Sequence, residues 1–332
     1  MSKFPKIKKR GAVRGFLGVW ILKLGVFPGL VISSAADSGQ FPRPPADILE
    51  AQVALARRNI SSGPIDGKFG AQTRAALIAF QEEQSLDATG RLNGETRAAL
   101  ALAAPPITTR IVTAADLASL HPVPPTWLGK SQQPSLAYAT ALEMAAEQSR
   151  AHPALLRQLN PGMIWEKIEP GTIIAIPDAG PETRAATIRA GEKAARIIIS
   201  LGEHTLQARA DDGRLLAHFP VSIARKIEKR PVGTLRVKTI APNPNYTFDP
   251  EIFTESEEAR ELGRKLIIPP GPNNPVGLVW IGLDKSGYGI HGTPEPEKVG
   301  RTESHGCFRL ANWDALALVE LVEIDTEVIV LP

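Results

Sequence analysis

The residues best suited to chemistry lie close together near the C-terminus. Cys307 is the only cysteine among the 332 residues, and two of the six histidines, His291 and His305, precede it by 16 and 2 positions. A thiol attacks a carbonyl carbon as its thiolate, so it needs a base or a positive field nearby, and imidazole supplies such a base near neutral pH. We therefore take the stretch from Tyr288 to Leu310 as the candidate catalytic site.

Glycines flank both candidate catalytic side chains. Gly292 follows His291 and leaves its own carbonyl uncovered, so this carbonyl can accept a hydrogen bond from the imidazole and fix its tautomer. Gly306 precedes the thiol, in a loop whose backbone N–H groups can converge on a developing oxyanion. The pattern predicts a nucleophile, a base, an orienter for the base and an oxyanion site within one stretch.

Two other interpretations of Cys307 fit the sequence less well. A single cysteine usually packs as a small buried apolar residue, but here a His-Gly pair and Arg309 flank it. A structural zinc site needs four ligands, and no second cysteine exists to join Cys307, His291 and His305. Arg309 is either a surface cation or a clamp for a substrate carboxylate.

The elements that must position this site form strands by their pattern. Short apolar segments separated by turn residues predict a mostly β domain with one or two helices. His204 and His218 fall inside two of these segments, and we interpret them as structural because neither has a nucleophile within reach in the sequence. The segments run over residues 195–201, 204–210, 215–224, 232–240, 276–283 and 328–331.

A helix is expected directly after the candidate site. Asn312 or Asp314 would cap it, which places Cys307 at a strand-to-helix junction where the helix N-terminus would lower the pKa of the thiol. Upstream, residues 243–253 form an aromatic, loop-rich segment, and a charged helix is predicted over 255–265. We interpret residues 243–253 as a possible flap over an extended peptide substrate.

The run from Ile290 to Leu310 resembles the catalytic signature of L,D-transpeptidases of the YkuD type, and the resemblance covers roughly residues 193–332. It implies a β-sandwich-like catalytic domain in which Cys307 is the acyl-accepting nucleophile. His291 would be the proton acceptor and donor, oriented by the Gly292 carbonyl. Phe308 replaces a commoner aliphatic residue, a change in packing only. The resemblance puts the oxyanion site at the backbone of His305, Gly306 and Cys307, and substrate contacts at Ser304, Arg309, Thr293 and Asn274.

The resemblance also implies a reaction that needs no cofactor or metal. The thiol would attack a peptidoglycan stem tetrapeptide and release D-Ala, and a second stem peptide would accept the acyl group to form a 3→3 cross-link. Water as acceptor would make the protein an L,D-carboxypeptidase, and a lipoprotein amine would make it an anchoring enzyme. Carbapenem-type β-lactams are expected inhibitors by the same resemblance.

Proteins of two other classes fit this sequence less well than such an enzyme does. A non-catalytic wall-binding protein with an inert YkuD-like domain should have lost Cys307 or His291, and both are present. A papain-like cysteine endopeptidase has its cysteine before its histidine, whereas here the histidine comes first and Gly292 follows it. Both features favour the transpeptidase.

A repeat follows a proline-rich lead near the N-terminus. Residues 66–77 recur 23 positions later as residues 89–100, each copy with a glycine turn, a large apolar residue and a helix start. This pattern predicts a small all-α module of three helices, with Asp47 capping the first. Gly67-Lys68-Phe69-Gly70 and the residues that follow resemble the peptidoglycan-binding type 1 domain, over residues 45–103.

Two further segments lie between this module and the catalytic domain. Residues 104–134 contain six prolines and predict an extended linker that holds the modules apart, with one short helix near residues 114–120. Residues 135–180 form a helix that ends in Asn-Pro-Gly before an Ile-rich strand, which resembles the second half of a small α+β LysM module. Glycan binding and a purely structural spacer are both open for this segment.

Residues 1–36 have the three parts of a secretory signal: a basic start, an apolar stretch and a small-residue cleavage site. Removing their seven basic residues leaves 31 basic against 35 acidic residues, so nothing predicts nucleic-acid binding. We expect an exported protein of the periplasm or cell wall, or a membrane-tethered one if the signal is not cleaved. A single cysteine excludes an internal disulfide, so stability must come from core burial.

Overall fold

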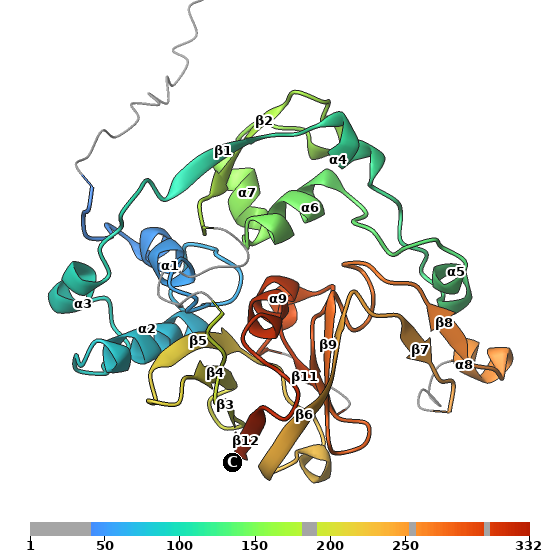
Figure 1. Cartoon of the computed structure of the whole chain (residues 1–332). Coiled ribbons are helices and arrows are strands. Elements are labelled where there is room, and N and C mark those ends of the chain that lie inside the picture. The colour runs from blue at the N-terminus through green and yellow to red at the C-terminus, as the bar shows by residue number, and fades with distance from the viewer. Residues whose placement is uncertain (1–40, 181–190, 252–256, 302–305) are drawn as a thin grey trace, which may run out of the picture. The chain divides into compact units, whose positions relative to one another are not determined.

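The structure, a computed structural model, describes residues 41–180, 191–251, 257–301 and 306–332. The predicted signal segment lies outside these residues. Within the described part, no helix is long and apolar enough to cross a membrane. Residues 40–332 form one compact unit, which contains all the elements discussed below (Figure 1).

The catalytic half is built on one mixed sheet of eight strands in the order β11-β10-β9-β6-β12-β3-β4-β5. Only the pairs β10–β11 and β12–β3 are parallel. This sheet confirms the predicted mostly β domain. The strands are β3 (Arg196–Ser200), β4 (Thr205–Arg209), β5 (Leu215–Pro220), β6 (Gly233–Pro242), β9 (Val279–Leu283), β10 (Gly289–His291), β11 (Phe308–Arg309) and β12 (Glu327–Leu331).

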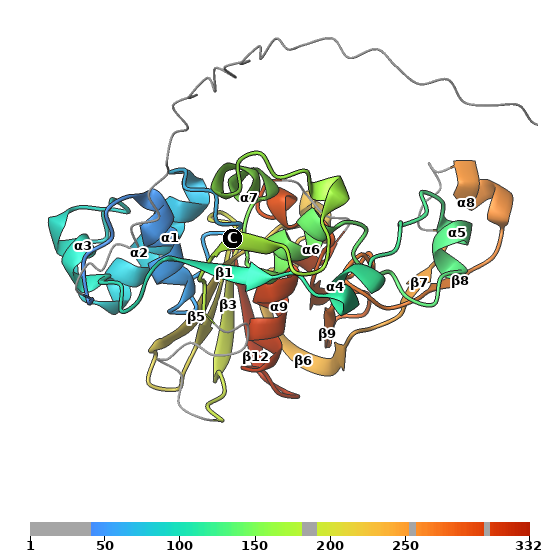
Figure 2. The same cartoon turned by 90° about the horizontal axis from the view of Figure 1, so that it is seen from above.

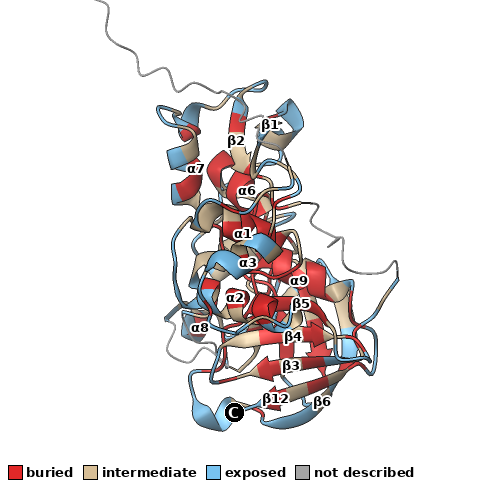
Figure 3. Cartoon of the chain, turned by 90° about the vertical axis from the view of Figure 1, so that its left-hand side faces the viewer, coloured by how far each residue is buried: buried red, intermediate tan, exposed pale blue. Residues whose placement is uncertain are grey.

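Alternation along the strands explains why this sheet has a buried face. Ile197 and Ile199 in β3, and Val328 and Val330 in β12, are each 0–1 % exposed, while their neighbours are partly exposed. Buried residues accordingly follow β3 and β4 in Figure 3. Helix α9 (Asn312–Val319) packs on β9 and β10 and closes the core over the strands that hold the candidate site.

The N-terminal module consists of three helices, α1 (Ile48–Ala56), α2 (Ala71–Glu83) and α3 (Gly94–Ala99), as predicted. Asp47 caps α1 by accepting a hydrogen bond from the Glu50 N–H at 2.9 Å, which confirms the expected helix start. The two repeat turns are held in the same way, because a buried glutamine of the preceding helix bonds to the backbone of each turn. Gln52 accepts from the Gly67 N–H, and Gln81 accepts from the Gly90 N–H, both at 2.8 Å.

The middle region corrects the predicted linker. Residues 104–134 contain strand β1 (Ile107–Ile111), which pairs antiparallel with β2 (Ile173–Pro177), so the predicted boundary at residue 135 cuts through one folded unit. The short helix expected near residues 114–120 is present as α4 (Ala114–Ala118), and α5 (Trp127–Ser131) follows. Helices α6 (Ala141–Gln148) and α7 (Pro153–Leu159) and the 3₁₀ turn η1 (Trp165–Lys167) complete the region. Strand β1, helices α6 and α7 and strand β2 thus form the core of this region. That the region is a LysM-like module remains a prediction.

The aromatic segment upstream of the site is more ordered than a loop. Strand β7 (Tyr246–Phe248) pairs with β8 (Leu266–Ile268), and α8 (Glu257–Leu262) lies between them in sequence. Trp127 of α5 stacks on Phe248 with ring centroids 4.4 Å apart. Figures 1 and 2 show α5 beside this β7–β8 hairpin, so the middle region buttresses the predicted flap.

The modules are packed together and not held apart as the extended linker predicted. Residues 59–66 of the first module run between the other two, where the Ser61 N–H donates to the His218 carbonyl and the Ile65 N–H donates to the Arg150 carbonyl, both at 2.8 Å. Ser61 also donates from Oγ to Asp314 Oδ2 of α9 at 3.0 Å. Burial raises the pKa of Asp314 to about 7, although Arg150 and Ser61 favour its charged form.

Candidate active site

His291 is the last residue of β10 and is only 6 % exposed. Its Nδ1 lies 2.6 Å from the Gly292 carbonyl oxygen, and since a carbonyl can only accept, Nδ1 carries the hydrogen. Nε2 therefore has its lone pair free to take a proton. Burial lowers the pKa of His291 to about 4, which keeps the imidazole neutral at pH 7.

The surroundings of His291 fix the position of this ring. Trp280 of the adjacent strand β9 stacks on it, with ring centroids 5.6 Å apart and an interplanar angle of 22°. Beside Gly292, the buried Asn312 accepts from the Leu278 N–H at 3.1 Å and donates to Glu147 Oε1 at 3.0 Å. A Cβ on Gly292 would lie 2.2 Å from Asn312 Oδ1, so glycine is required there by close packing.

Cys307 comes directly before β11, which pairs in parallel with β10 so that Arg309 lies opposite His291. The strand pairing thus brings the only cysteine beside the strand of the buried histidine. Burial raises the pKa of the Cys307 thiol, and a backbone hydrogen bond and the charge of Arg309 lower it by less. At neutral pH the resting pair is therefore a neutral thiol and a neutral imidazole.

This electrostatic state corrects the sequence-based expectation for the thiol. Helix α9 does begin shortly after Cys307, but its N-cap is Ala311, which makes no side-chain cap. Asn312 and Asp314 are buried and bond inside the protein, so neither of the two expected caps forms. Burial is the largest influence on the thiol, and the pKa of Cys307 moves up and not down.

Arg309 and Tyr246 complete the charged and polar surroundings of the thiol. The half-buried Arg309 lowers the pKa of both His291 and Cys307 through its positive charge. Burial raises the pKa of Tyr246 to about 12, and interaction with Cys307 contributes to this shift. Tyr246 lies in β7, so the β7–β8 hairpin reaches the site. The sequence singled out this aromatic segment but not Tyr246 as a site residue.

The other predicted site residues fall into two groups: some lie outside the described residues, and others are buried and hydrogen-bonded inside the protein. Ser304 and His305 lie outside the described residues, whereas Gly306 is described next to the thiol. Thr293 is buried and accepts from the Glu295 N–H at 3.3 Å. Asn274 is fully buried, donates to the Pro269 carbonyl at 2.8 Å and accepts from the Val276 N–H at 2.9 Å. We assign Thr293 and Asn274 to the scaffold of the site and not to substrate contacts.

Sequence reasoning missed three residues that shape the site. The sequence pattern indicates Asn312 only as a helix cap, and it includes Trp280 only within the predicted strand of residues 276–283. Glu147 comes from the middle region. Their contacts depend on which elements pack together, since Glu147 and Asn312 are 165 positions apart. The arrangement as a whole can carry out nucleophilic acyl transfer, in which an oriented neutral base takes the proton of a thiol as it attacks.

Two segments of the chain match known protein families. Residues 194–330 match the L,D-transpeptidase catalytic domain named YkuD, and residues 44–100 match a family described as a "Putative peptidoglycan binding domain". These ranges correspond to the eight-stranded sheet domain and to the three-helix module.

Several curated relatives are similar over the catalytic half. "Putative L,D-transpeptidase YkuD" of Bacillus licheniformis is 29% identical over 58% of this chain and 93% of its own length. "Probable L,D-transpeptidase YbiS" of Escherichia coli is 28% identical over 56% of this chain and 58% of its own length. The chain thus spans nearly all of the first relative but little more than half of the second. A structure of L,D-transpeptidase 3 from Mycobacterium tuberculosis with a faropenem-derived adduct is 19% identical, with a TM-score of 0.32 over 41% of this chain and 59% of that chain.

Proposed function

The chain belongs to the L,D-transpeptidase family through residues 194–330, and on this premise we propose that it uses Cys307 to cross-link peptidoglycan stem peptides. The donor would be a stem tetrapeptide and the acceptor the side-chain amine of a second stem. The observation that carries the proposal is the neutral, buried His291, held by its 2.6 Å bond to the Gly292 carbonyl on the strand beside the only thiol.

The first half-reaction forms a thioester. As the Sγ of Cys307 attacks the carbonyl carbon between the third stem residue and D-Ala, Nε2 of His291 takes the thiol proton. Backbone N–H groups at Gly306 and Cys307 stabilise the oxyanion, a contribution that is typically large in acyl transfer. The C–N bond then breaks, His291 returns its proton to the leaving amine, and free D-Ala departs.

The second half-reaction regenerates the thiol. An amine of another stem attacks the thioester carbonyl and loses a proton to His291. The C–S bond breaks, and Cys307 recovers a proton from the imidazole. The product is a 3→3 cross-link. Because the resting imidazole is neutral, it can act as the base in both halves without a prior proton transfer.

The location of the protein follows from the same proposal. The module at residues 44–100 would hold the enzyme on the wall, in the periplasm or cell wall after export. A retained N-terminal segment would tether it to the membrane. A β-lactam of the carbapenem type would inhibit the enzyme, because Cys307 would attack the strained carbonyl of the ring and become acylated. The nitrogen released from that carbonyl would stay attached to the acyl group, so no product would leave the site.

Mass spectrometry of the purified chain with a disaccharide tetrapeptide tests the proposed function. We expect a product of dimer mass less one D-Ala, which disappears in Cys307→Ala. A tripeptide alone would mean that water is the acceptor and the protein is an L,D-carboxypeptidase. An anchoring enzyme would give a dimer only with a lipoprotein amine. An unchanged tetrapeptide under all conditions would leave a non-catalytic wall-binding protein.

A further inference from the structure

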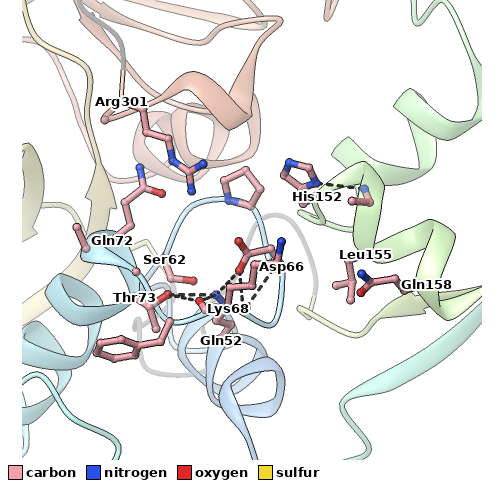
Figure 4. Close-up of a pocket in the computed structure, with 16 residues that line it drawn as sticks. Gln52, Ser62, Asp66, Lys68, Gln72, Thr73, His152, Leu155, Gln158 and Arg301 are labelled. Carbon is pink, nitrogen blue, oxygen red and sulfur yellow. Dashed lines mark hydrogen bonds between the residues drawn. The ribbon is translucent and has the colours of Figure 1, made fainter.

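A cavity of about 360 Å³ lies where the three modules meet (Figure 4). Its walls come from the loop of residues 62–73 in the first module, from His152 and helix α7 in the middle region, and from Gly300 and Arg301 of the catalytic domain. This volume is within the range of small-molecule sites. Neither Cys307 nor His291 lines the cavity, so it is separate from the proposed reaction.

The walls of the cavity are fixed by hydrogen bonds between modules. Gln72 of α2 donates from Nε2 to the Val299 carbonyl of the catalytic domain. The packing around this side chain is close, because a Cβ on Gly300 would lie 2.7 Å from Gln72 Nε2. On the opposite wall, the His152 N–H of the middle region donates to the Ile65 carbonyl of the first module at 2.9 Å (Figure 4). The cavity is therefore a built feature of the assembled chain.

Three features favour an anionic group in the cavity. Ser62 is 5 % exposed, and its Oγ has no hydrogen-bond partner among the described residues although the side chain lines the cavity. Helix α2 begins at the same wall with Gly70 as its N-cap, which provides no side chain for the free N–H groups of the first turn. Lys68 and Arg301 add two cations, and Arg301 points into the cavity in Figure 4. Asp66 also lines the cavity, but its Oδ1 accepts from Gln52 Nε2 at 3.0 Å and from the Lys68 N–H at 2.9 Å, so this carboxylate is held within the first module. The remaining polar groups suit a carboxylate.

The rest of the lining suits a sugar ring with an amide. Phe69 is 52 % exposed at the cavity and offers an aromatic face on which a sugar ring can pack. In the second repeat Leu92 takes the corresponding position and packs against the module core. Gln158 of α7 adds an amide that can both donate and accept. An apolar face beside a few convergent polar groups is the ordinary lining of a ligand site.

We propose that this cavity binds an N-acetylated saccharide that carries a carboxylate, namely a muramyl unit of the wall with the first residues of its peptide. The inference rests on the proposed function, because it takes the wall as the ligand of the chain. It adds that the binding site needs all three modules, since the cations come from the first and the third and the Gln158 amide comes from the middle region. Residues 44–100 alone would then bind the wall more weakly than the whole chain.

Isothermal titration of the full chain with N-acetylmuramyl-L-alanyl-D-glutamate, which keeps the free α-carboxylate of the second stem residue, tests the site, using Cys307→Ala to prevent turnover. Lys68→Ala and Arg301→Ala should each weaken binding roughly fivefold or more, as expected for loss of a charge-assisted hydrogen bond. The matched control is Arg91→Ala, because Arg91 is exposed and occupies the position of Lys68 in the second repeat. Gln158→Ala is compared with Arg157→Ala, its exposed neighbour on α7, which does not line the cavity.

The neutral sugar N,N′-diacetylchitobiose serves as the second probe and should bind more weakly than the muramyl dipeptide. Equal affinity for both probes would overturn the carboxylate assignment. Equal affinity of Lys68→Ala, Arg301→Ala and Arg91→Ala would overturn the cavity as the site, and so would an absence of binding by a folded chain. D-Ala release by the Cys307 enzyme is measured in parallel, so the loss of one activity without the other shows which proposal fails.

Discussion

Two buried histidines lie in strands near opposite ends of the same sheet. His291 is in β10, next to the edge strand β11, and His218 is in the edge strand β5. Burial lowers the pKa of each to about 4. Their ring nitrogens differ, because His291 donates from Nδ1 to the Gly292 carbonyl, whereas neither nitrogen of His218 has a hydrogen-bond partner among the described residues.

The comparison shows that burial and a lowered pKa do not by themselves identify a catalytic histidine. A general base needs one nitrogen held and the other aimed at the reacting proton, and only His291 meets the first condition. His218 instead bonds to the first module through its backbone. Its N–H donates to the Asn59 carbonyl at 3.0 Å, and its carbonyl accepts from the Ser61 N–H at 2.8 Å. We therefore assign His218 to the contact between the first module and the sheet.

The largest expected effect separates these two histidines directly. His291→Gln should lower kcat for D-Ala release by about 10²- to 10⁴-fold, the usual contribution of a general acid–base residue. His218→Gln should keep kcat within a few-fold of the unmodified enzyme. Kinetic assays on both variants, with thermal unfolding as the control for folding, check the prediction. Equal losses of kcat in two folded variants would refute the assignment of roles.

The next effect concerns the support of the His291 orienter. Asn312→Ala removes the acceptor of the Leu278 N–H and the donor to Glu147, and it should cost about 1–3 kcal/mol of unfolding free energy. It should also lower kcat, since Gly292 loses the side chain packed against it. Denaturant unfolding and steady-state kinetics measure the two effects.

Asn274→Ala is the matched control for Asn312, because its amide is equally buried and bonds to the Pro269 carbonyl and the Val276 N–H. A comparable loss of stability with little change in kcat is expected. If Asn274→Ala instead raised KM sharply at unchanged stability, the residue would contact substrate, as the sequence resemblance implied.

The sequence was most informative where one short stretch contains the whole feature. The Gly292 carbonyl as orienter of His291 was predicted because the two residues are adjacent, and the bond is present at 2.6 Å. The repeat predicted the three helices for a similar reason, since each copy contains its own turn and helix start. In such cases local chemistry decides the structure.

Features that depend on distant packing could not be predicted in this way. The pKa of Cys307 rises because the folded sheet buries it, which no neighbour in sequence reveals. Strand β1 was hidden in a proline-rich segment because its partner β2 lies more than 60 residues later. The role of Asn312 depends on Glu147 of another module in the same way. Composition and local pattern do not indicate which residues pack together when they are this far apart in the sequence.

The lowered pKa of His218 also predicts a pH dependence of stability. The pKa of His218 is about 4 in the folded chain and about 6.5 when unfolded, so the unfolded state binds more protons between these values. His218 therefore makes the free energy of unfolding rise with pH across this window, by up to about 1.4 kcal/mol per pH unit. Asp314 acts in the opposite direction, because its pKa is raised to about 7.

Because these contributions overlap, the test is a difference between two unfolding curves. Denaturant titrations of the unmodified chain and of His218→Gln from pH 4 to 7 should diverge in slope below pH 6.5 and run parallel above it. Parallel curves over the whole range would mean that His218 is protonated equally in the folded and unfolded states.

The smallest effect tests why the pKa of His291 is low. Trp280 covers the imidazole, so Trp280→Leu should let water closer and raise the pKa of His291 from about 4 toward its usual value near 6.5. The acidic limb of the kcat/KM profile should move to higher pH, with a few-fold loss of activity near pH 5 and almost none at pH 8. Trp313→Leu is the comparison, since Trp313 is buried in α9 and makes no ring contact with His291. An acidic limb that moves equally in both variants would show that general loosening of the core, and not removal of the stacked ring, controls the base.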